Sequence, residues 1–539
     1  MMPAALRRRS SMDRYDGIVI GAGHNGLVLA AYLARAGLKV AVLERNPDIG
    51  GGCVTREVTL PGFRHNTHAN FLVGWDLAPP FYDLELYKYG LGLIIPPVQV
   101  GVAFRDGTAL TVHRDLERTC RSIARFSERD AKTYRELYRK FAEGARDTIT
   151  YLLYSPPLPP EELGPRLQEA GLGELAQYSA LTISEAVERH FEDEHVRVMF
   201  KLFLHAYTLE DIPGAGFFFP RIFSRIDRLA LAVGGTANLS LALARAVRAH
   251  GGTIVTGAHV RRILVRDNRA VGVELADGTA LGADRFVASS ADFPQTVQLA
   301  GEGSFDSDIV DKAYRWQWAG HALVVLHLAL REPPHYRSAA FDPDIDQAFN
   351  LFIGGDTSEE IRTCFDDIHR GRFPTYPMGN GACDTIFDPT YAPGGGHTAF
   401  WWPFVPYELE GADWDDEATK REVTERLLEV WRQYAPNLDS GNVLATYLHT
   451  PKDTARDVIT MVRGSHQIGA YTLDQWGYTR PHPALSHYRT PVEGLYLCGS
   501  TSHPGGSVTG APGYNAANVI ARDLGLQPWW RPLTPPWQR

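Results

Sequence analysis

Cysteine is scarce in this chain of 539 residues, and its five cysteines are scattered without a Cys-x-x-Cys pair. That spacing excludes a dithiol redox motif and argues against a disulfide framework. Because it is typical of a reducing compartment, we expect a cytoplasmic protein, or one of an organelle matrix if the source is eukaryotic. No apolar run reaches the roughly 18 residues that a membrane-spanning helix requires.

Positive charge is not in excess either. Lys and Arg together number 54 against 63 Asp and Glu, which gives a formal net charge of −9 at pH 7. A nucleic-acid-binding surface requires a basic patch, so nucleic acid is not expected as a partner. The first twelve residues are basic but lack the apolar segment of a secretory signal. We expect a disordered leader over residues 1–12.

Glycine, in contrast, is plentiful and clustered. The first cluster is Gly21-Ala-Gly-His-Asn-Gly26, between the apolar run 17–20 and a helical pattern over 27–36. Gly21 permits a tight turn after a strand, Gly23 lets the backbone approach a pyrophosphate, and Gly26 lets the helix pack closely on the sheet. The pyrophosphate would lie on free N–H groups at the positive end of that helix. This context predicts a dinucleotide-binding turn in an α/β fold with a Rossmann-type domain.

A second glycine cluster indicates a long cofactor. The strand predicted over residues 38–43 ends at Glu44, about where an acidic side chain accepts hydrogen bonds from a ribose. Gly50-Gly-Gly52 follows at once, and a simple nicotinamide dehydrogenase does not need it. FAD would use it, because the chain must run alongside the rest of that dinucleotide. No second Gly-x-Gly-x-x-Gly is present to hold a nicotinamide, so dioxygen or a quinone is the expected electron acceptor.

The rest of the pattern indicates a discontinuous cofactor domain with insertions. A last strand, glycine cluster and helix occupy residues 494–524, and residues 331–395, rich in Pro, Gly and Asp, are expected to be mostly loop. The predicted domains are an FAD-binding domain of residues 13–75, 225–300 and 460–525, a mixed-sheet substrate-binding domain of residues 76–114, 204–224 and 301–459, and a helical lid of residues 115–203.

Several motifs together resemble one known family. They are Gly21–Gly26, Glu44-Arg45, Gly51-Gly52, Asp474-Gln475, Arg480-Pro481, Tyr488–Pro491, Gly494–Gly506 and Val508–Asn515. The set is similar to the phytoene desaturase superfamily, and most similar to the branch that contains pyridine nucleotide-disulphide oxidoreductase domain-containing protein 2 and its bacterial relatives. The resemblance covers roughly residues 13–525. It implies an FAD-dependent oxidoreductase fold shared with carotenoid desaturases and, more distantly, with amine oxidases.

The glycine clusters and this resemblance together imply a set of FAD contacts. The expected residues are Gly21, Gly23, His24, Asn25, Gly26, Glu44, Arg45, Gly51, Gly52, Thr55, His68, Val260, Gly499, Ser500, Pro504, Gly505, Gly506, Val508, Gly513 and Asn515. Two positions depart from the family pattern. Ser500 follows Gly499 where many flavoproteins have an Asp for the ribityl chain, and Ser507 stands where relatives tend to have a Gly, which would narrow or polarise the flavin edge.

Catalytic groups are harder to predict. No acid–base or nucleophilic constellation stands out, and His503 is the best candidate for a catalytic polar group, with a structural hydrogen bond as the alternative. His65 and His68 have a spacing that could suit a metal, but no carboxylate or thiol accompanies them, so no metal site is predicted. The aromatic residues expected to line an apolar substrate tunnel are Phe218, Trp316, Trp401 and Trp402, with ordinary core strands as the alternative.

The sequence therefore predicts an FAD-dependent dehydrogenase or desaturase. It would remove hydride from an apolar small molecule, isoprenoid or aromatic, onto flavin N5. A flavin amine oxidase or monooxygenase on the same fold, and a flavin-bound protein without catalytic activity, are the alternatives. Peripheral contact with a membrane would suit a lipophilic substrate, although no strongly basic amphipathic helix requires it. The oligomeric state stays open.

Overall fold

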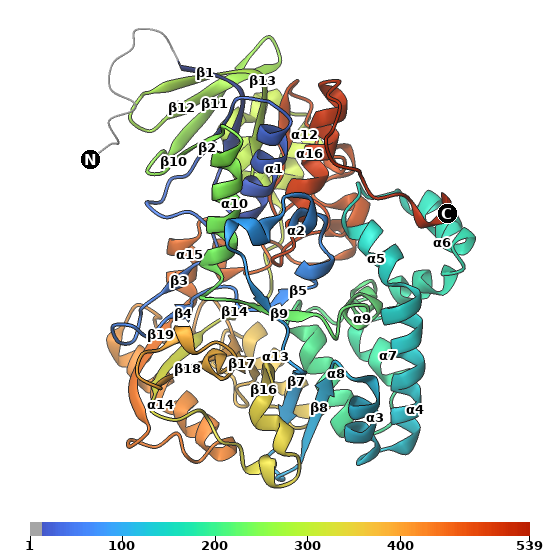
Figure 1. Cartoon of the computed structure of the whole chain (residues 1–539), viewed down its shortest axis with the longest axis vertical. Helices are drawn as coiled ribbons and strands as arrows, with labels where there is room; N and C mark the ends of the chain where they lie inside the picture. Colours follow the sequence, from blue (N-terminus) through green and yellow to red (C-terminus); the bar gives the residue numbers. More distant parts are fainter. Residues whose placement is uncertain (1–12, 539) are drawn as a thin grey trace.

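Two mixed β-sheets, one above the other in Figure 1, organise the protein. The computed structural model describes residues 13–538, so the predicted leader over residues 1–12 lies outside the described residues. Within that range no helix is long and apolar enough to cross a membrane.

The upper sheet has a Rossmann-type core. Its strands are β1 (Asp13–Ile20), β2 (Val40–Leu43), β10 (Thr253–Val255), β11 (Val260–Arg266), β12 (Arg269–Leu275), β13 (Ala280–Ser289) and β20 (Leu495–Leu497). They run in the order β10-β2-β1-β13-β12-β11, and β20 also pairs with β13. Strands β10, β2, β1, β13 and β20 are parallel, whereas β11 and β12 form an antiparallel meander. The mixed α/β, Rossmann-like fold expected from the sequence is confirmed.

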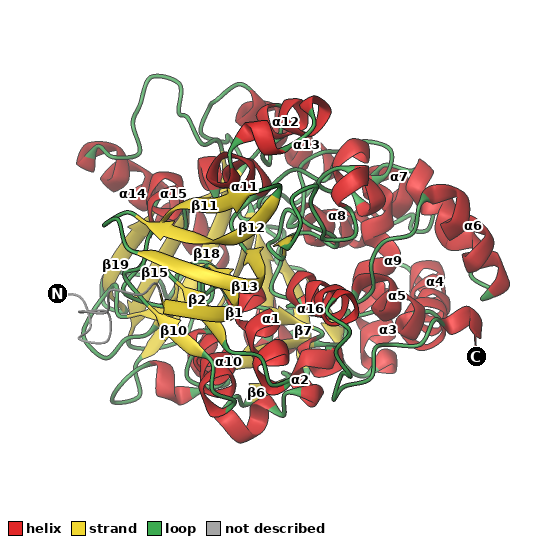
Figure 2. Ribbon diagram, turned by 90° about the horizontal axis from the view of Figure 1, so that it is seen from above, coloured by secondary structure: helices red, strands yellow, loops and turns green. Residues whose placement is uncertain are grey.

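Helices on both sides bury the upper sheet, as parallel strands require. They are α1 (His24–Arg35), α10 (Ala237–Ala249), α11 (Phe293–Ala300), α12 (Ser307–Tyr314) and α16 (Ala511–Asp523). Helix α1 packs against α10 and α16, and α11 packs against β11. Figure 2, seen from above, shows α1, α10 and α16 on one side of the strands and α11 and α12 toward the other. The segment Val40–Leu43 is correspondingly buried throughout.

The lower sheet is mostly antiparallel. Its strands are β7 (Val98–Ala103), β8 (Ala109–His113), β14 (Ala322–Leu323), β15 (Val325–Leu330), β16 (Asn350–Ile353), β17 (Gly379–Ala382), β18 (His397–Val405) and β19 (Val443–His449). The order is β19-β15-β18-β17-β16-β7-β8, and β14 also pairs with β18. Among its described strands, only β7 and β16 pair in parallel. Helices α13 (Ser358–His369), α14 (Glu417–Tyr434) and α15 (Pro451–Asp457) belong to the same part of the chain.

A helical region lies beside the lower sheet in Figure 1, and most of its helices fall within residues 115–203, where the sequence has a helical pattern. Its helices are α3 (Leu116–Ala124), α4 (Glu128–Leu137), α5 (Arg146–Leu153), α6 (Pro160–Glu169), α7 (Ile183–Glu188), α8 (Glu194–His205) and α9 (Phe218–Phe223). Asp115, Ser127 and Asp193 begin α3, α4 and α8 by accepting hydrogen bonds from free backbone N–H groups. Short elements complete the fold: α2 (Pro79–Asp83), β3 (Thr55–Arg56), β4 (His65–Asn66), β5 (Leu72–Val73), β6 (Leu93–Ile94) and β9 (Leu229–Ala232).

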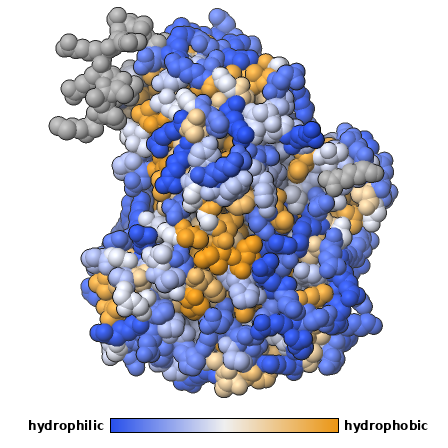
Figure 3. Space-filling view, viewed as in Figure 1, coloured by the Kyte–Doolittle hydropathy of each residue, from blue (hydrophilic) through white to orange (hydrophobic). Residues whose placement is uncertain are grey.

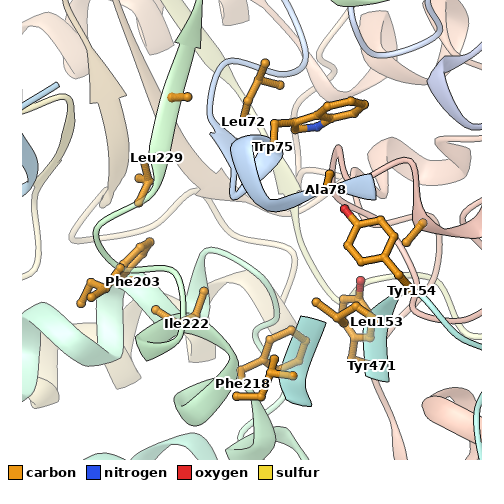
Figure 4. Close-up of a cluster of buried hydrophobic side chains, with 14 of the residues drawn as sticks. Leu72, Trp75, Ala78, Leu153, Tyr154, Phe203, Phe218, Ile222, Leu229 and Tyr471 are labelled. Atoms are coloured by element: carbon orange, nitrogen blue, oxygen red, sulfur yellow. The ribbon is translucent and has the colours of Figure 1, made fainter. Parts of the chain in front are cut away.

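Apolar side chains join these parts at the centre of the molecule. Figure 4 shows Leu72 from β5 and Leu229 from β9 near Phe203 of α8 and Ile222 of α9, all within one buried cluster. Leu72 and Leu229 are fully shielded from solvent, and Phe203 is 3% exposed. The helical region is therefore anchored in the main core and closes one side of the space between the sheets.

The strands of the upper sheet come from within residues 13–75, 225–300 and 460–525, and those of the lower sheet from within 76–114 and 301–459. The domain boundaries themselves stay a prediction. The expectation that residues 331–395 are mostly loop was wrong over Ser358–His369, which forms α13. Its buried face, Ile361, Cys364, Phe365 and Ile368, has the spacing of an amphipathic helix.

Candidate cofactor and substrate site

The first glycine cluster forms a tight turn between β1 and α1. Gly21 has φ of +91°, in the left-handed region that favours glycine, and its N–H donates to the Leu43 carbonyl at 2.7 Å. A Cβ on Gly26 would lie 2.3 Å from the Gly21 carbonyl oxygen, so only glycine lets the helix come this close to the turn. Helix α1 then begins at His24 with Gly23 as its N-cap, leaving free N–H groups at its positive end.

Gly23 and the second glycine cluster lie against each other. A Cβ on Gly51 would lie 3.4 Å from the Cα of Gly23, and Gly50 forms a parallel bridge with Gly23. In contrast, a Cβ on Gly23 itself would meet no atom within 4 Å. The absence of a side chain at Gly23 therefore leaves open space that no protein atom fills, beside the positive end of α1.

Glu44 lies at the end of β2, where the sequence places a ribose-binding carboxylate. Its Oε2 accepts a hydrogen bond from the Ala22 N–H and its Oε1 from the Asn46 N–H, both at 2.9 Å. Each carboxylate oxygen can accept a further hydrogen bond. Glu44 is only 7% exposed, but it lines a cavity. The two backbone hydrogen bonds hold its carboxylate in that position.

We call that space the outer cavity. It encloses about 1100 Å³, part of it open to solvent, and lies at the carboxyl ends of the parallel strands, where open α/β sheets bind their ligands. Six of the predicted cofactor residues line it: Gly21, Gly23, Glu44, Arg45, Gly51 and Val260.

A second space, the inner cavity, extends from the same turn into the centre of the molecule. It encloses about 1220 Å³, part of it open to solvent. Its apolar wall includes Phe71, Val73, Phe203, Leu229, Trp402 and Phe404. Within the described part of the chain, its lining includes no Asp, Glu, Lys or Arg. The inner cavity is therefore suited to an uncharged, largely apolar molecule.

The two cavities meet. Both are lined by Gly23, Gly51, Ser290, Val458 and Thr460. The junction lies at the positive end of α1, where phosphate groups bind most readily. A dinucleotide could thus lie with one half in each cavity and its pyrophosphate at the junction.

The inner cavity also brings together predicted residues from all three glycine clusters. They are His24, Asn25, Gly52, His68, Ser500 and Val508, in addition to Gly23 and Gly51. The Asn25 side chain donates from Nδ2 to the Ser500 Oγ at 3.2 Å, which links residues 475 positions apart. Burial lowers the pKa of His24 to about 4, so its imidazole is neutral near pH 7.

Ser507, the departure from the family pattern, lies on the wall of the inner cavity. Its φ is +78°, a conformation that favours glycine and carries strain on the order of 1 kcal/mol or more in other residues. Its Oγ lies 3.3 Å from Gln467 Oε1, to which it donates a hydrogen bond. The hydroxyl is thus held by a second cavity residue, and this wall is more polar than glycine would make it.

The remaining predicted cofactor residues line neither cavity: Gly26, Thr55, Gly499, Pro504, Gly505, Gly506, Gly513 and Asn515. Several have packing roles. A Cβ on Gly499 would lie 2.6 Å from the Ser290 carbonyl oxygen, and one on Gly513 would lie 2.1 Å from that of Asn25. Gly499 and Gly513 therefore allow close packing of their segments, including α16, against the residues around the Gly21–Gly26 turn. They support the cavity walls without lining them.

His503 is not among the cavity-lining residues either. It is 7% exposed, and its Nε2–H lies 2.8 Å from the Leu152 carbonyl oxygen, to which it donates. Burial lowers its pKa to about 4. This contact fits the structural hydrogen bond that was the alternative, and a catalytic role for His503 stays a prediction.

Of the four predicted substrate-lining aromatic residues, only Trp402 reaches the inner cavity. Side chains alternate across a strand, so on β18 Trp401 faces the opposite side and packs against Trp431. Trp316 packs against Phe293, and Phe218 stacks on Tyr207. These three residues belong to the cores around the cavity.

Four cavity residues carried no local signal that singled them out in the sequence. Asn350 of β16 and Asn380 of β17 line the inner cavity on adjacent strands, and Asn380 Nδ2 donates to Asn350 Oδ1 at 2.9 Å. His466 and Gln467 come from an irregular segment after α15. His466 Nε2–H donates to the Ala206 carbonyl at 3.3 Å, Nδ1 has no partner, and burial lowers the pKa of the ring to about 4.

Known proteins share this organisation over nearly the whole chain. Residues 19–85 match the model of the NAD(P)-binding Rossmann-like domain. A limonene dehydrogenase subunit of Castellaniella defragrans is 33% identical, covering 97% of each chain. Pyridine nucleotide-disulfide oxidoreductase domain-containing protein 2 of Rattus norvegicus is 32% identical, covering 95% of this chain and 94% of its own. A lycopene-forming phytoene desaturase of Paracoccus is 26% identical, covering 94% and 97%.

Among solved structures, an oxidoreductase from Methanosarcina mazei shares the fold. Its TM-score is 0.59 at 17% identity, with 94% of this chain and 99% of that one covered. The two relatives above 30% identity establish the family, and the predicted branch is confirmed. The chain belongs to the phytoene desaturase-like superfamily of FAD-dependent oxidoreductases, in the branch of pyridine nucleotide-disulfide oxidoreductase domain-containing protein 2 and the limonene dehydrogenase of Castellaniella defragrans.

Proposed function

We propose that the protein binds FAD across the two cavities, with the ADP half in the outer cavity and the isoalloxazine in the inner one. The empty space beside Gly23, the free N–H groups of α1 and the Glu44 carboxylate fit a pyrophosphate and a ribose. Residues shared by the two cavities make the path continuous. When bound, FAD supplies a hydride acceptor at N5.

The reaction that we propose is dehydrogenation of an apolar small molecule. The observation that carries this proposal is the lining of the inner cavity, which is rich in apolar side chains and has no charged residue among those described. Phe71, Trp402 and Phe404 would hold a hydrocarbon by burying its surface, at about 25 cal/mol per Å². These side chains would also exclude water from the reacting carbon–hydrogen bond.

The substrate class that we favour is a small isoprenoid, for which an aromatic hydrocarbon is the alternative. The relative covering 97% of this chain is named as part of a limonene dehydrogenase, and other relatives are named for carotenoid desaturation. The hydrogen-bonded side-chain amides of Asn350 and Asn380 are polar groups in a wall that also contains many apolar side chains. These amides would orient a substrate or product that carries one oxygen atom.

His466 is the residue best placed to accept a proton that the substrate loses after hydride removal. It lines the inner cavity, and with Nε2–H donating to Ala206, Nδ1 keeps its lone pair. Dioxygen or a quinone is the proposed electron acceptor, since a single dinucleotide-binding turn is present in the sequence.

An apolar area on the surface is compatible with peripheral contact with a membrane. Figure 3 shows that apolar residues gather near the middle of this face, between the upper and lower parts of the molecule. Among the described residues, exposed large hydrophobic side chains include Tyr82, at 58%, and Tyr87, at 53%. A lipophilic substrate would enter the protein most readily from such a contact.

Anaerobic titration of the flavin-loaded protein tests the proposed function. Cyclic terpene hydrocarbons are expected to bleach the oxidised flavin absorbance, whereas amines and NADPH are expected to leave it unchanged. An amine would need a counter-ion that the inner cavity lacks among its described residues. Rapid bleaching by an amine would favour the amine oxidase alternative, and bleaching by NADPH would favour a monooxygenase.

A further inference from the structure

Three potential metal ligands meet beside the inner cavity, although they are far apart in the sequence. His68 follows β4, His449 ends β19, and Asp457 ends α15. One ligating atom from each lies within 4.8 Å of the others. The sequence predicted no metal site because His65 and His68 had no neighbouring carboxylate. Folding brings a second imidazole, that of His449, and the carboxylate of Asp457 to His68 from nearly 400 residues away.

The two imidazoles carry nitrogen atoms that no hydrogen bond satisfies. His449 is 2% exposed, and neither Nδ1 nor Nε2 has a partner. Nε2 of His68 is also buried without a partner, and it lies 3.6 Å from Asp457 Oδ2, too far for a good hydrogen bond. A buried polar group without a hydrogen-bond partner is destabilising, so a ligand that several of these nitrogens share would stabilise the folded protein.

We propose that His68, His449 and Asp457 bind a divalent transition-metal ion of the zinc type. Two imidazole nitrogens and one carboxylate oxygen are ligands that Zn²⁺ prefers, and water would complete the coordination. One ion would pair with a nitrogen of His449 and with Nε2 of His68, both of which otherwise lack a partner.

The two arginines nearby are compatible with this site. Arg56 Nη1 donates to Asp457 Oδ2 at 2.7 Å, which leaves Oδ1 for the ion and fixes the carboxylate, as outer partners of metal ligands commonly do. The charge of Arg456 is balanced by Asp415 and Asp453. A surface cavity of about 580 Å³, lined by Arg56, His68 and Asp457, connects the cluster to solvent.

The ion would connect the two halves of the protein. It would tie β19 of the lower sheet and α15 to the loop after β4, which borders the cofactor cavities. Since His68 also lines the inner cavity, the ion would fix its ring against the space where we place the isoalloxazine. The metal site itself does not depend on the proposed reaction.

Metal binding by the full chain, in the flavin-loaded form as purified, tests the proposal directly. After removal of metals by chelation and dialysis, calorimetric titration with Zn²⁺ is expected to show one site per chain with a Kd at or below the micromolar range. Titration with Co²⁺ is expected to give visible absorption bands of a low-coordinate cobalt ion with nitrogen and oxygen ligands.

Two ligand variants and one control complete the experiment. Asp457→Asn, which keeps the shape of the side chain but removes its charge, and His449→Ala are each expected to weaken Zn²⁺ binding at least a hundredfold. His250→Gln, at the end of α10 and outside the cluster, is expected to bind like the wild type. Circular dichroism establishes that each variant is folded. The proposal is overturned if the folded wild type binds no stoichiometric Zn²⁺, or if folded Asp457→Asn binds it as tightly as the wild type.

Discussion

Trp401 and Trp402 are adjacent in the chain and lie on opposite faces of the lower sheet. Trp402 borders the inner cavity, whereas Trp401 is fully buried against Trp431 and donates from Nε1 to the Gly379 carbonyl at 3.2 Å. One strand thus separates a side chain that would contact substrate from one that holds the sheet together.

Substituting the two tryptophans should separate these roles. Trp401→Ala is expected to lower the free energy of unfolding by about 3–5 kcal/mol, because it leaves a cavity in the core. Trp402→Ala is expected to lower kcat/KM for a terpene substrate at least tenfold, because it removes an apolar contact with the substrate. Denaturant unfolding and steady-state kinetics measure the two effects. Equal kinetic losses in both variants would contradict the assignment of the cavity wall.

Alanine substitutions at Gly23 and Gly26 should separate cofactor binding from stability of the fold. Gly23→Ala is expected to leave the stability of the flavin-free protein within about 0.5 kcal/mol, since a Cβ there meets no atom within 4 Å. It should nevertheless weaken FAD binding at least tenfold, because the methyl group would occupy the proposed pyrophosphate position. Gly26→Ala is expected to destabilise the fold itself by about 1–3 kcal/mol, since its Cβ would lie 2.3 Å from backbone.

Flavin titration by fluorescence, together with denaturant unfolding, distinguishes the two glycine variants. A Gly23→Ala protein that binds FAD as tightly as the wild type would place the pyrophosphate elsewhere.

His466 and His503 are a third pair, because both are buried and neutral and donate to a backbone carbonyl, but only His466 lines the inner cavity. His466→Gln is expected to lower kcat roughly a hundredfold, as the loss of a proton acceptor does. His503→Gln is expected to lower the free energy of unfolding by about 1 kcal/mol with little change in kcat. Stopped-flow reduction of the flavin measures the first effect, and thermal unfolding the second. A larger loss of kcat in His503→Gln would restore the catalytic role that the sequence suggests.

Asp292 should make stability depend on pH. It is the N-cap of α11, 1% exposed, and burial raises its pKa to about 7 despite the hydrogen bond from the Gln295 N–H. The folded state therefore keeps a proton that the unfolded chain releases near pH 4. The contribution of Asp292 to stability is present below pH 4 and is lost as the pH rises to 7, at a rate of up to about 1.4 kcal/mol per pH unit.

Asp292→Asn tests this dependence, because Asn caps helices about as well as Asp. Relative to the wild type, the variant should become more stable as the pH rises from 4 to 7 and should change little above that. Urea unfolding at a series of pH values gives the difference in free energy. A difference that is constant across this range would show that Asp292 has an ordinary pKa.

Local patterns in the sequence predict the parts of the site that are built from residues close together in the chain. The turn at Gly21–Gly26 and Glu44 follow from spacing, because strand, turn and helix are continuous there. The alternation along β18 could also have separated Trp401 from Trp402 once a strand was assumed. Strand β17, Gly379–Ala382, carries no such signal, because its small and polar residues lack β-propensity and its burial comes from the strands beside it.

Residues brought together by folding alone could not be predicted. His449 and Asp457 meet His68 only because β19 and α15 pack beside the loop after β4, and no spacing in the sequence encodes that contact. The same holds for His466, which reaches the inner cavity from an irregular segment. These residues carry the chemistry that we propose, whereas the predictable ones are those that we propose to hold the nucleotide.

The pairing of β13 with both β1 and β20 has a consequence for how the protein is made. Strand β1 is complete at residue 20, but its partner β13 ends at residue 289 and β20 ends at residue 497. At about 5–20 residues per second, a ribosome needs roughly 25–100 s to pass from the first of these strands to the last. During synthesis β1 can pair early with β2, but it has no β13 beside it until residue 289 is made, and β20 follows later still. Binding of the proposed flavin is therefore expected to follow translation, and chains that terminate early should emerge without it.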